Sequence, residues 1–373
     1  MYSIAATASI FISFFITAYL FSKKNYLPHI DTSSIQKRYF FIDGLRGLAA
    51  VCVVVGHSWR IGAKWIDLSS YPIISGGLIA AIGVQIFFCI TGFLFIDQVI
   101  KRQATFNWMS FFKSRIKRLV PLFIVSTTIC VFIIYCENIY SIMDITKRDI
   151  VNTIKLYTFG FFGGGVVTIN GVDSSLLTIM HWTLPFEWKF YFSIPFLCLA
   201  CILIKNKSFI TIFIFFCIIT YIFNGFYFGK WFLTGCFSAI IFNATKTPEK
   251  KYRAFISIVG VMSLVPLFIV KENAYGMLNF ICVSVFFLSV IISKPTLLKE
   301  KTLIYIGESS YSIYLNHTII MFVVPLILFL INGVIVVDNA PVALLILALT
   351  SLIISSVSFL SFKNIEEPFL RKK

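Results

Sequence analysis

Long apolar runs, separated by short clusters of basic residues, dominate this 373-residue chain. A helix that crosses the hydrocarbon core of a bilayer needs about 20 predominantly apolar residues. The predicted fold is therefore an all-α, polytopic membrane helix bundle with about eleven transmembrane helices. The candidate spans are 3–21, 40–60, 74–96, 117–136, 182–204, 208–224, 227–243, 254–270, 275–293, 310–331 and 341–362.

Composition supports this interpretation. Hydrophobic residues make up 58% of the chain and charged residues only 13%, whereas a soluble domain has about 25% charged residues. The mean hydropathy is +0.91, and a water-soluble core could not hide so much apolar surface. The run at 3–21 has no basic segment before it and no small-residue cleavage site after it, so we expect a membrane helix there and not a signal peptide.

The net charge of +16 does not indicate a nucleic-acid partner, because the basic residues lie in short clusters between the apolar runs. Lys and Arg concentrate in alternate loops, as the positive-inside rule predicts for cytoplasmic loops. This pattern predicts an outside N-terminus and a cytoplasmic C-terminus. The predicted cytoplasmic loops are those after the first, third, fifth, seventh, ninth and last spans.

The nine cysteines do not indicate a metal or redox site. Cys198 and Cys201 have the C-x-x-C spacing, but they lie in an apolar run without nearby basic residues, which favours a packing role. No zinc-type spacing is present, so we expect no metal.

Ionisable residues inside membrane spans are costly and are usually functional. Arg46 and His57 lie in one span, and their spacing brings them within about 20° of the same helix face, roughly 16 Å apart along the axis. A neutral His is suited to act as a general base for a hydroxyl group. The alternative is that Asp43 and Arg46 form an i, i+3 ion pair at a helix start and that His57 is an interfacial residue.

Arg115 and Arg118 lie three residues apart before Pro121, at the predicted cytoplasmic mouth of the fourth span. Two guanidinium groups on one helix face can grip phosphates bidentately, which indicates a phosphate-bearing cosubstrate. An ordinary cytoplasmic cluster of positive charges is the alternative explanation.

The segment 181–191 begins the fifth span from the outside and contains Glu187 about one and a half turns into the helix. A Glu at a depth similar to that of His57 could orient or charge-balance the imidazole. The aromatic residues of this segment are also typical of an interfacial belt. In the segment 309–317, hydroxyl side chains favour close helix packing, and Asn316 and His317 could form hydrogen bonds between helices.

The longest outside loop, at 137–181, contains the Gly-rich aromatic patch 159–165. Glycines allow sharp turns and close approach of the backbone. Such a patch is compatible with a re-entrant or interfacial segment, and the alternative is a loop on the membrane surface.

These segments together resemble the motifs of the acyltransferase-3 family of integral-membrane acyltransferases. The resemblance covers nearly the whole chain, from Phe41 to Phe369, and departs from the family in having Thr91 where the family has Ser. The matching residues, in the family's order, are Asp43 to Ala50 with His57, Thr91 to Leu94, Arg115 with Arg118 and Pro121, Trp182 to Leu184 with Glu187 and Tyr191, Tyr311 to His317, and Glu366 to Pro368.

The resemblance implies an O-acetyltransferase that moves an acyl group, usually acetyl, from cytoplasmic acyl-CoA to a sugar hydroxyl of a surface glycan. Lipopolysaccharide O-antigen, built on a lipid carrier, is one such acceptor. The family's ten-helix core implies two parts here: an extra N-terminal helix with its loop at 1–39, and an acyltransferase domain at 40–373. Because many relatives carry a further C-terminal domain and the chain ends at Lys373, we expect a stand-alone version.

The expected site residues follow from both lines of reasoning. The catalytic group comprises His57, Glu187, Arg46 and Asp43, and the group that binds acetyl-CoA comprises Arg115, Arg118 and, on the cytoplasmic side of its helix, His317. The expected partners are the acyl-CoA cosubstrate, a lipid-linked or surface glycan and membrane lipids, with no bound cofactor, metal or nucleic acid. The alternatives are a proton-coupled transporter of a glycolipid or small solute and a non-catalytic assembly protein.

Overall fold

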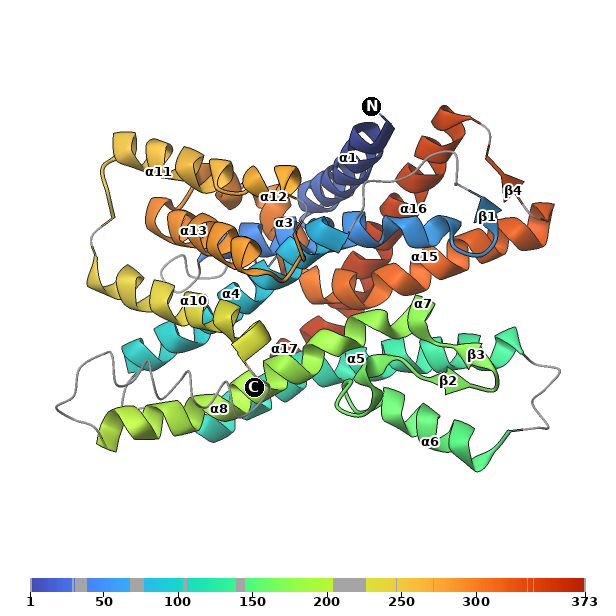
Figure 1. The fold of residues 1–373 in the computed structure, drawn as a ribbon, viewed down its shortest axis with the longest axis horizontal. Helices are drawn as coiled ribbons and strands as arrows, with labels where there is room; N and C mark the ends of the chain where they lie inside the picture. The colour runs from blue at the N-terminus through green and yellow to red at the C-terminus, as the bar shows by residue number, and fades with distance from the viewer. Residues whose placement is uncertain are drawn as a thin grey trace. The chain divides into compact units, whose positions relative to one another are not determined.

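The computed structural model describes residues 2–28, 30, 39–67, 77–102, 106–138, 145–203, 226–245, 247–270, 272–333, 335–337 and 339–371. Almost all of the regular structure in these residues is helical (Figure 1). The α-helices are α1 (Tyr2–Lys23), α3 (Phe40–His57), α4 (Gly77–Arg102), α5 (Trp108–Glu137), α6 (Lys147–Leu156), α7 (Ser175–Thr178), α8 (Leu184–Leu203), α10 (Phe226–Ala244), α11 (Lys250–Met262), α12 (Pro266–Ile269), α13 (Met277–Ser293), α14 (Lys301–Glu308), α15 (Ser310–Asn332), α16 (Ala340–Ser361) and α17 (Glu367–Arg371).

Short elements connect and extend these helices. The 3-10 turns are Ser58–Gly62, Gly163–Gly165, Ile179–Thr183 and Thr296–Lys299, and a π-helical turn, Phe362–Glu366, joins α16 to α17. The strands β1 (Ile66–Asp67) and β4 (Ile335–Val336) pair in parallel with Ile66 opposite Ile335. The strands β2 (Thr168–Ile169) and β3 (Val172–Asp173) form an antiparallel hairpin with Thr168 opposite Asp173.

The prediction of an all-α, multi-pass membrane protein is confirmed. Within the described part of the chain, 7 helices are long and apolar enough to cross a membrane. The predicted span 208–224 lies outside the described residues, so the full number of crossings stays a prediction. The 7 segments are Ser3–Lys23, Phe40–Gly62, Gly77–Arg102, Trp108–Glu137, Lys250–Ile269, Ser310–Asn332 and Ala340–Leu370.

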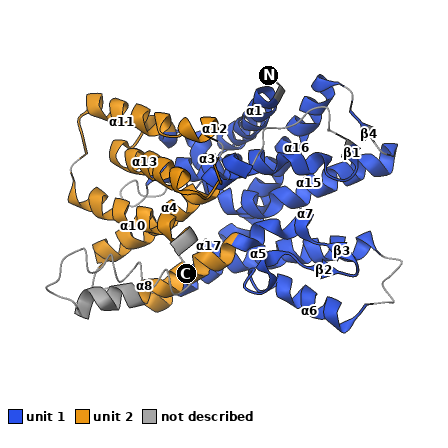
Figure 2. Cartoon of the chain, in the orientation of Figure 1, with its two compact units in different colours: residues 1–83, 112–182, 298–373 blue, residues 84–111, 183–297 orange. Residues whose placement is uncertain are grey.

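The chain forms two compact units, which Figure 2 shows in different colours. Unit 1 comprises Met1–Gly83, Phe112–Trp182 and Leu298–Lys373, and unit 2 comprises Val84–Phe111 and Thr183–Leu297. Unit 1 therefore unites both ends of the sequence with the long loop that follows α5.

In unit 1, glycines allow α3 and α14 to cross at close range. A Cβ atom at Gly44 would collide with the carbonyl group of Leu298, and a Cβ atom at Gly307 would collide with the carbonyl group of Asp43. Small residues at a crossing let two helix backbones approach closely, which is how helices associate in membranes. The glycine of the segment Asp43-Gly44-Leu45-Arg46 thus has a packing role.

Helix α1 packs against α16 within the same unit. The buried hydroxyl group of Ser355 donates a hydrogen bond of 2.8 Å to the hydroxyl group of Thr17. Paired hydroxyl groups satisfy each other where water is absent and join helices in a bilayer. Helix α1 therefore packs within unit 1, and the division of the chain into an N-terminal part at 1–39 and an acyltransferase domain at 40–373 stays a prediction.

Unit 2 contains a second glycine crossing, between α4 and α10. A Cβ atom at Gly92 would collide with the carbonyl group of Phe232, and one at Gly235 would collide with the carbonyl group of Cys89. Beside the crossing, the rings of Phe88 and Phe232 stack with centroids 4.6 Å apart. The Gly of the Thr91-Gly92-Phe93-Leu94 segment is thus explained by helix packing.

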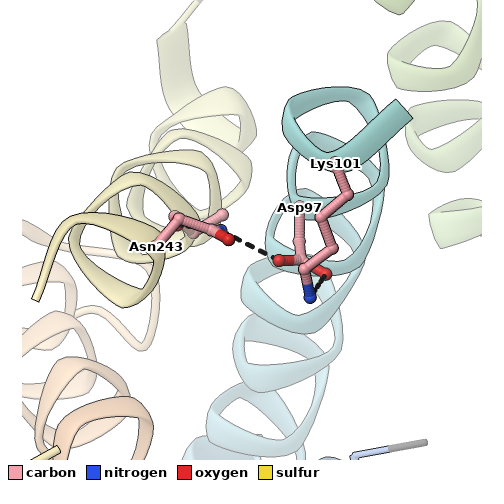
Figure 3. A network of polar contacts seen from close by, with 4 residues as sticks. Asp97, Lys101 and Asn243 are labelled. Atoms are coloured by element: carbon pink, nitrogen blue, oxygen red, sulfur yellow. Dashed lines mark hydrogen bonds and ion pairs between the residues drawn. The ribbon is translucent and has the colours of Figure 1, made fainter. Parts of the chain in front are cut away.

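A buried carboxylate lies farther along the same two helices. The side chain of Asp97 accepts hydrogen bonds from Lys101 at 3.0 Å and from Asn243 at 2.9 Å (Figure 3). Asp97 is buried, and its two partners satisfy one oxygen each. Because an isolated charge is costly away from water, this pairing links α4 to α10 with a specific register.

Candidate active site

The predicted base, His57, forms a hydrogen bond with a second histidine. In unit 1, α3 and α15 pack against each other, and Nδ1 of His57 lies 2.8 Å from Nε2 of His317. The ring planes are inclined by only 6°. His317 is fully buried, whereas His57 is partly exposed. Of the two rings, only that of His57 is accessible from outside the protein.

The hydrogen bonds of the pair define which nitrogen carries each proton when both rings are neutral. Nδ1 of His317 lies 3.1 Å from the carbonyl oxygen of Ile313, and a carbonyl oxygen can only accept. Nδ1 of His317 therefore carries a proton and its Nε2 accepts. Nδ1 of His57 must then donate to His317, which leaves the lone pair on Nε2 of His57 as a base or nucleophile.

Arg60 is a further member of the site, and the sequence analysis did not identify it. It lies one 3-10 turn beyond His57, where residues i and i+3 are aligned, and its charge acts on both histidines. Its Nη1 donates a hydrogen bond of 3.0 Å to the carbonyl oxygen of Ser175. A cavity of about 10 Å³ adjoins Arg60, room for about one water molecule, and is lined by Arg60, Lys64, Trp65, Leu176, Met321 and Phe322.

Arg46 lies near the N-terminal end of α3, on the same helix face as His57. Its Nη2 donates a hydrogen bond of 3.0 Å to the hydroxyl group of Ser310, and its Nη1 lies 4.0 Å from Oδ1 of Asp43. Both predicted relations of Arg46 are therefore present: the i, i+3 contact with Asp43 and a position on the helix face of His57. The bonds of α3 to Ser310 and His317 show that α3 and α15 run in the same direction.

A buried carboxylate, Glu366, lies near the end of α3 that carries Arg46. Its Oε1 accepts a hydrogen bond from the hydroxyl group of Ser312, and the charges of Arg118, Glu308 and Arg46 act on it. Oε2 of Glu366 and Nη2 of Arg118 are buried, and neither has a hydrogen-bond partner among the described residues. Two cations and two carboxylates from α3, α5, α14 and the turn after α16 thus form an inner polar cluster.

The two arginines of the predicted donor site have different surroundings. Arg118 takes part in the inner polar cluster, whereas Nη2 of Arg115 donates a hydrogen bond of 3.1 Å to the hydroxyl group of the adjacent Ser114. Both side chains are half-buried. The chemistry available here is cationic and oriented, which suits a phosphate-bearing ligand.

Glu187 lies on α8 in unit 2, and its Oε2 accepts a hydrogen bond of 2.9 Å from the hydroxyl group of Tyr191. The role of Glu187 in orienting His57 stays a prediction.

The segment before α8 packs directly on the helix that carries His317. The hydroxyl group of Tyr314 donates to the carbonyl oxygen of Met180 at 2.7 Å, and that of Thr318 donates to the carbonyl oxygen of Leu177 at 2.7 Å. These bonds flank His317 on α15. The long loop after α5 therefore forms one wall of the histidine pair.

The long apolar helices and the buried polar groups between them define a multi-pass integral membrane protein. Its identity follows from comparison with known proteins: a family model described as an acyltransferase domain matches residues 39–360. The chain therefore belongs to the acyltransferase-3 family.

Named relatives agree with this assignment. O-acetyltransferase OatA from Staphylococcus aureus (strain NCTC 8325 / PS 47) is 28% identical over 373 residues, covering 89% of this chain and 57% of the relative. A second protein from S. aureus (strain COL), provisionally named as an O-acetyltransferase, is 25% identical and covers 75% of this chain and 51% of its own length. The chain thus spans about half the length of these relatives. No solved structure matches the chain at a significant level.

Proposed function

We propose that this protein is a membrane O-acetyltransferase in which His57 is the catalytic base. The observation that carries the proposal is the hydrogen bond between His57 and His317, because it leaves a lone pair on Nε2 of the more exposed ring. The family and the names of the relatives support acyl transfer to oxygen. General base catalysis by a positioned His contributes about 10²–10⁴-fold to such reactions.

The proposed reaction transfers an acetyl group from acetyl-CoA to a hydroxyl group of the acceptor. Nε2 of His57 takes the hydroxyl proton while the acceptor oxygen attacks the thioester carbonyl carbon. The new C–O bond forms, the C–S bond breaks, and the leaving thiolate takes the proton back from His57. In a second route, Nε2 attacks the thioester first and expels the thiolate. The acceptor oxygen then attacks the acyl-histidine, the N–C bond breaks, and the thiolate takes the hydroxyl proton.

We assign His317 a positioning role in this reaction. It holds His57 in one tautomer and one orientation, as an acid residue does for the His of a hydrolase triad. The sequence analysis expected His317 at the donor site on the cytoplasmic side. The bond to His57 supports the positioning role instead, since the ring nitrogens of His317 are engaged by His57 and Ile313.

The donor is proposed to bind at the inner end of α3. Arg115 and Arg118 would hold the phosphates of CoA, and Arg46, held by Asp43 and Ser310, would stabilise negative charge that develops on the thioester oxygen. Glu187 remains the proposed partner that balances charge on His57. The axial distance of about 16 Å between Arg46 and His57 is comparable to the reach of an extended thioester arm.

The proposed topology places the donor in the cytoplasm and the acceptor outside. The loop charges support an outside N-terminus and a cytoplasmic C-terminus in the bacterial inner membrane. The acceptor is proposed to be a sugar hydroxyl of a lipid-linked or surface glycan, and lipopolysaccharide O-antigen is one candidate. The acyltransferase domain is proposed to occupy 40–373, with the helix at 1–39 as an addition.

The decisive experiment follows labelled acetyl groups from acetyl-CoA into the glycan of membrane vesicles. We expect incorporation with the unmodified protein, and a fall of at least about 10²-fold with His57→Ala at equal protein in the membrane. Asn316→Ala is a matched control, because Asn316 bonds to Ser361 at 2.8 Å and not to the pair. Full incorporation by His57→Ala would refute the assignment, and unlabelled glycan with the unmodified protein would favour transport or assembly.

A further inference from the structure

Helix α6, in the loop after α5, exposes three apolar side chains and buries two polar ones, while its last residue, Leu156, is also buried. Ile150, Val151 and Ile154 are 53%, 50% and 60% exposed, whereas Asp149 and Asn152 are buried. An amphipathic helix on a protein in water has the opposite arrangement. The exposed side of α6 therefore requires an apolar environment.

The inward polar side is fully engaged, so the arrangement is specific. Oδ1 of Asp149 accepts a hydrogen bond of 2.7 Å from the backbone amide of Asn170, and Asn152 donates one of 2.9 Å to the carbonyl oxygen of Thr168. Asp149 also forms a capping box with Thr146. These bonds fasten α6 to the β2–β3 hairpin, which lies beside it in Figure 1.

Contacts with α5 show how far residues 147–159 extend along that helix. Thr153 bonds to Tyr135 at 2.9 Å, and Tyr157 bonds to Thr128 at 3.0 Å. Helix α6 and the residue that follows it thus run antiparallel to α5, from the C-terminal end of α5 towards its middle. Phe159, just beyond α6, stacks on Phe123 with centroids 3.9 Å apart.

Phe123 lies about 21 Å below the end of α5 at Glu137, since a helix rises about 1.5 Å per residue. This distance is more than half of a hydrocarbon core that is about 30 Å thick. The chain therefore reaches the middle of a membrane-spanning helix without crossing to its other end.

The Gly-rich patch 159–165 then reverses the chain. Gly163, Gly164 and Gly165 all have positive φ, at 83°, 62° and 81°, which glycine adopts without strain. A Cβ atom at Gly165 would collide with Cβ of His181. On the outer side of this turn, Phe161 and Phe162 are 42% and 64% exposed.

We propose that residues 147–165 form a re-entrant element that enters the membrane beside α5, with Ile150, Val151, Ile154, Phe161 and Phe162 in contact with the acyl chains of membrane lipid. The apolar exposed side continues the exposed apolar surface of α5, where Phe132 is 68% exposed. Lys147 and Arg148, exposed at the outer start of α6, are placed for lipid phosphates. This element does not depend on the proposed acetyl transfer.

The test measures the depth of spin labels in the intact protein reconstituted into phospholipid vesicles. A nitroxide is attached through p-acetylphenylalanine, incorporated singly at Ile150, Ile154 or Phe162. Phe132 is the lipid-exposed reference and Arg148 is the shallow reference on the same helix. We expect oxygen to relax the labels at Ile154 and Phe162 more effectively than the water-soluble nickel chelate, as at Phe132.

Depth must also increase along the element. Between Ile150 and Ile154 the label should sink by up to about 6 Å, and Phe162 should be deeper still. Preferential relaxation by the nickel chelate at Ile154 and Phe162 would overturn lipid contact. Equal depth at all three positions would show a helix lying flat on the membrane and would overturn re-entry.

Discussion

Nδ1 of His57 and Nε2 of His317 lie 2.8 Å apart, although 260 residues separate them in the sequence. The contact joins two helices of one compact unit and engages Nε2 of His317, whose Nδ1 is engaged by the carbonyl oxygen of Ile313. It brings two separate sequence motifs into one hydrogen-bonded pair.

Replacement of His317 tests the positioning role. In His317→Ala, His57 loses its orienting acceptor, so we expect kcat to fall by about 10²–10⁴-fold while the KM for acetyl-CoA changes little. Steady-state kinetics with varied donor concentration checks this. A raised KM with an unchanged kcat would instead place His317 in the donor site. Partial recovery in His317→Gln, whose carbonyl oxygen can accept from Nδ1 of His57, would support the hydrogen bond as the cause.

The inner polar cluster predicts coupling between Arg118 and Glu366. Glu366→Met removes a buried carboxylate whose charge interacts with that of Arg118, and loss of one partner of a buried charge pair costs up to about 3–5 kcal/mol. We expect a clear loss of thermal stability in detergent. The double variant Arg118→Met/Glu366→Met should be less destabilised than the sum of the single variants, and strict additivity would show that the two groups do not interact.

The glycine crossing of α4 and α10 predicts the effect of a single methyl group. Gly92→Ala and Gly235→Ala each place a Cβ atom against a backbone carbonyl group of the facing helix, and overpacking of this kind costs about 1–3 kcal/mol. Thermal unfolding of the purified protein provides the measurement. Gly77→Ala is the matched control, since a Cβ atom there would meet nothing within 4 Å, and an equal loss in the control would contradict the crossing.

The loop around α6 should be sensitive to acid. A hydrogen bond from the Thr146 side chain, followed by those from the amides of Asn170 and Thr146, lowers the pKa of Asp149. The stabilisation is complete above the ordinary Asp pKa of about 3.9 and is lost as the pH falls through the lower pKa of the folded state. Hydrogen exchange of residues 145–173 between pH 7 and pH 3 measures it. Asp149→Asn should flatten the dependence on pH, whereas Asp173→Asn should retain it.

Patterns within single segments of the sequence predicted several of the helices and the helix face shared by Arg46 and His57. The spacing of Arg46 and His57 depends only on helix geometry, and the structure places both residues on the side of α3 that contacts α15. The apolar runs likewise predicted helices such as α13 and α15 to within a few residues. In both cases the signal lies within one helix.

Contacts between distant segments were not accessible in this way. Nothing near His317 in the sequence indicates His57, and Arg60 resembles an ordinary loop charge until the 3-10 turn aligns it with the pair. Helix α6 was not predicted because its 10 residues are too few for a span. Its buried Asp149 and Asn152 are explained only by the hairpin that follows.

Unit 1 draws on three separate stretches of the chain, and the last of them begins at Leu298. During synthesis, α3 therefore enters the membrane long before α14 and α15 exist. Until then, Arg46 and His57 lack Ser310 and His317, and the glycine surface of α3 lacks Gly307. The nascent protein must keep a charged helix in the bilayer without its final neighbours, so the contacts of Arg46 and His57 with α15 are among the last to form in its biogenesis.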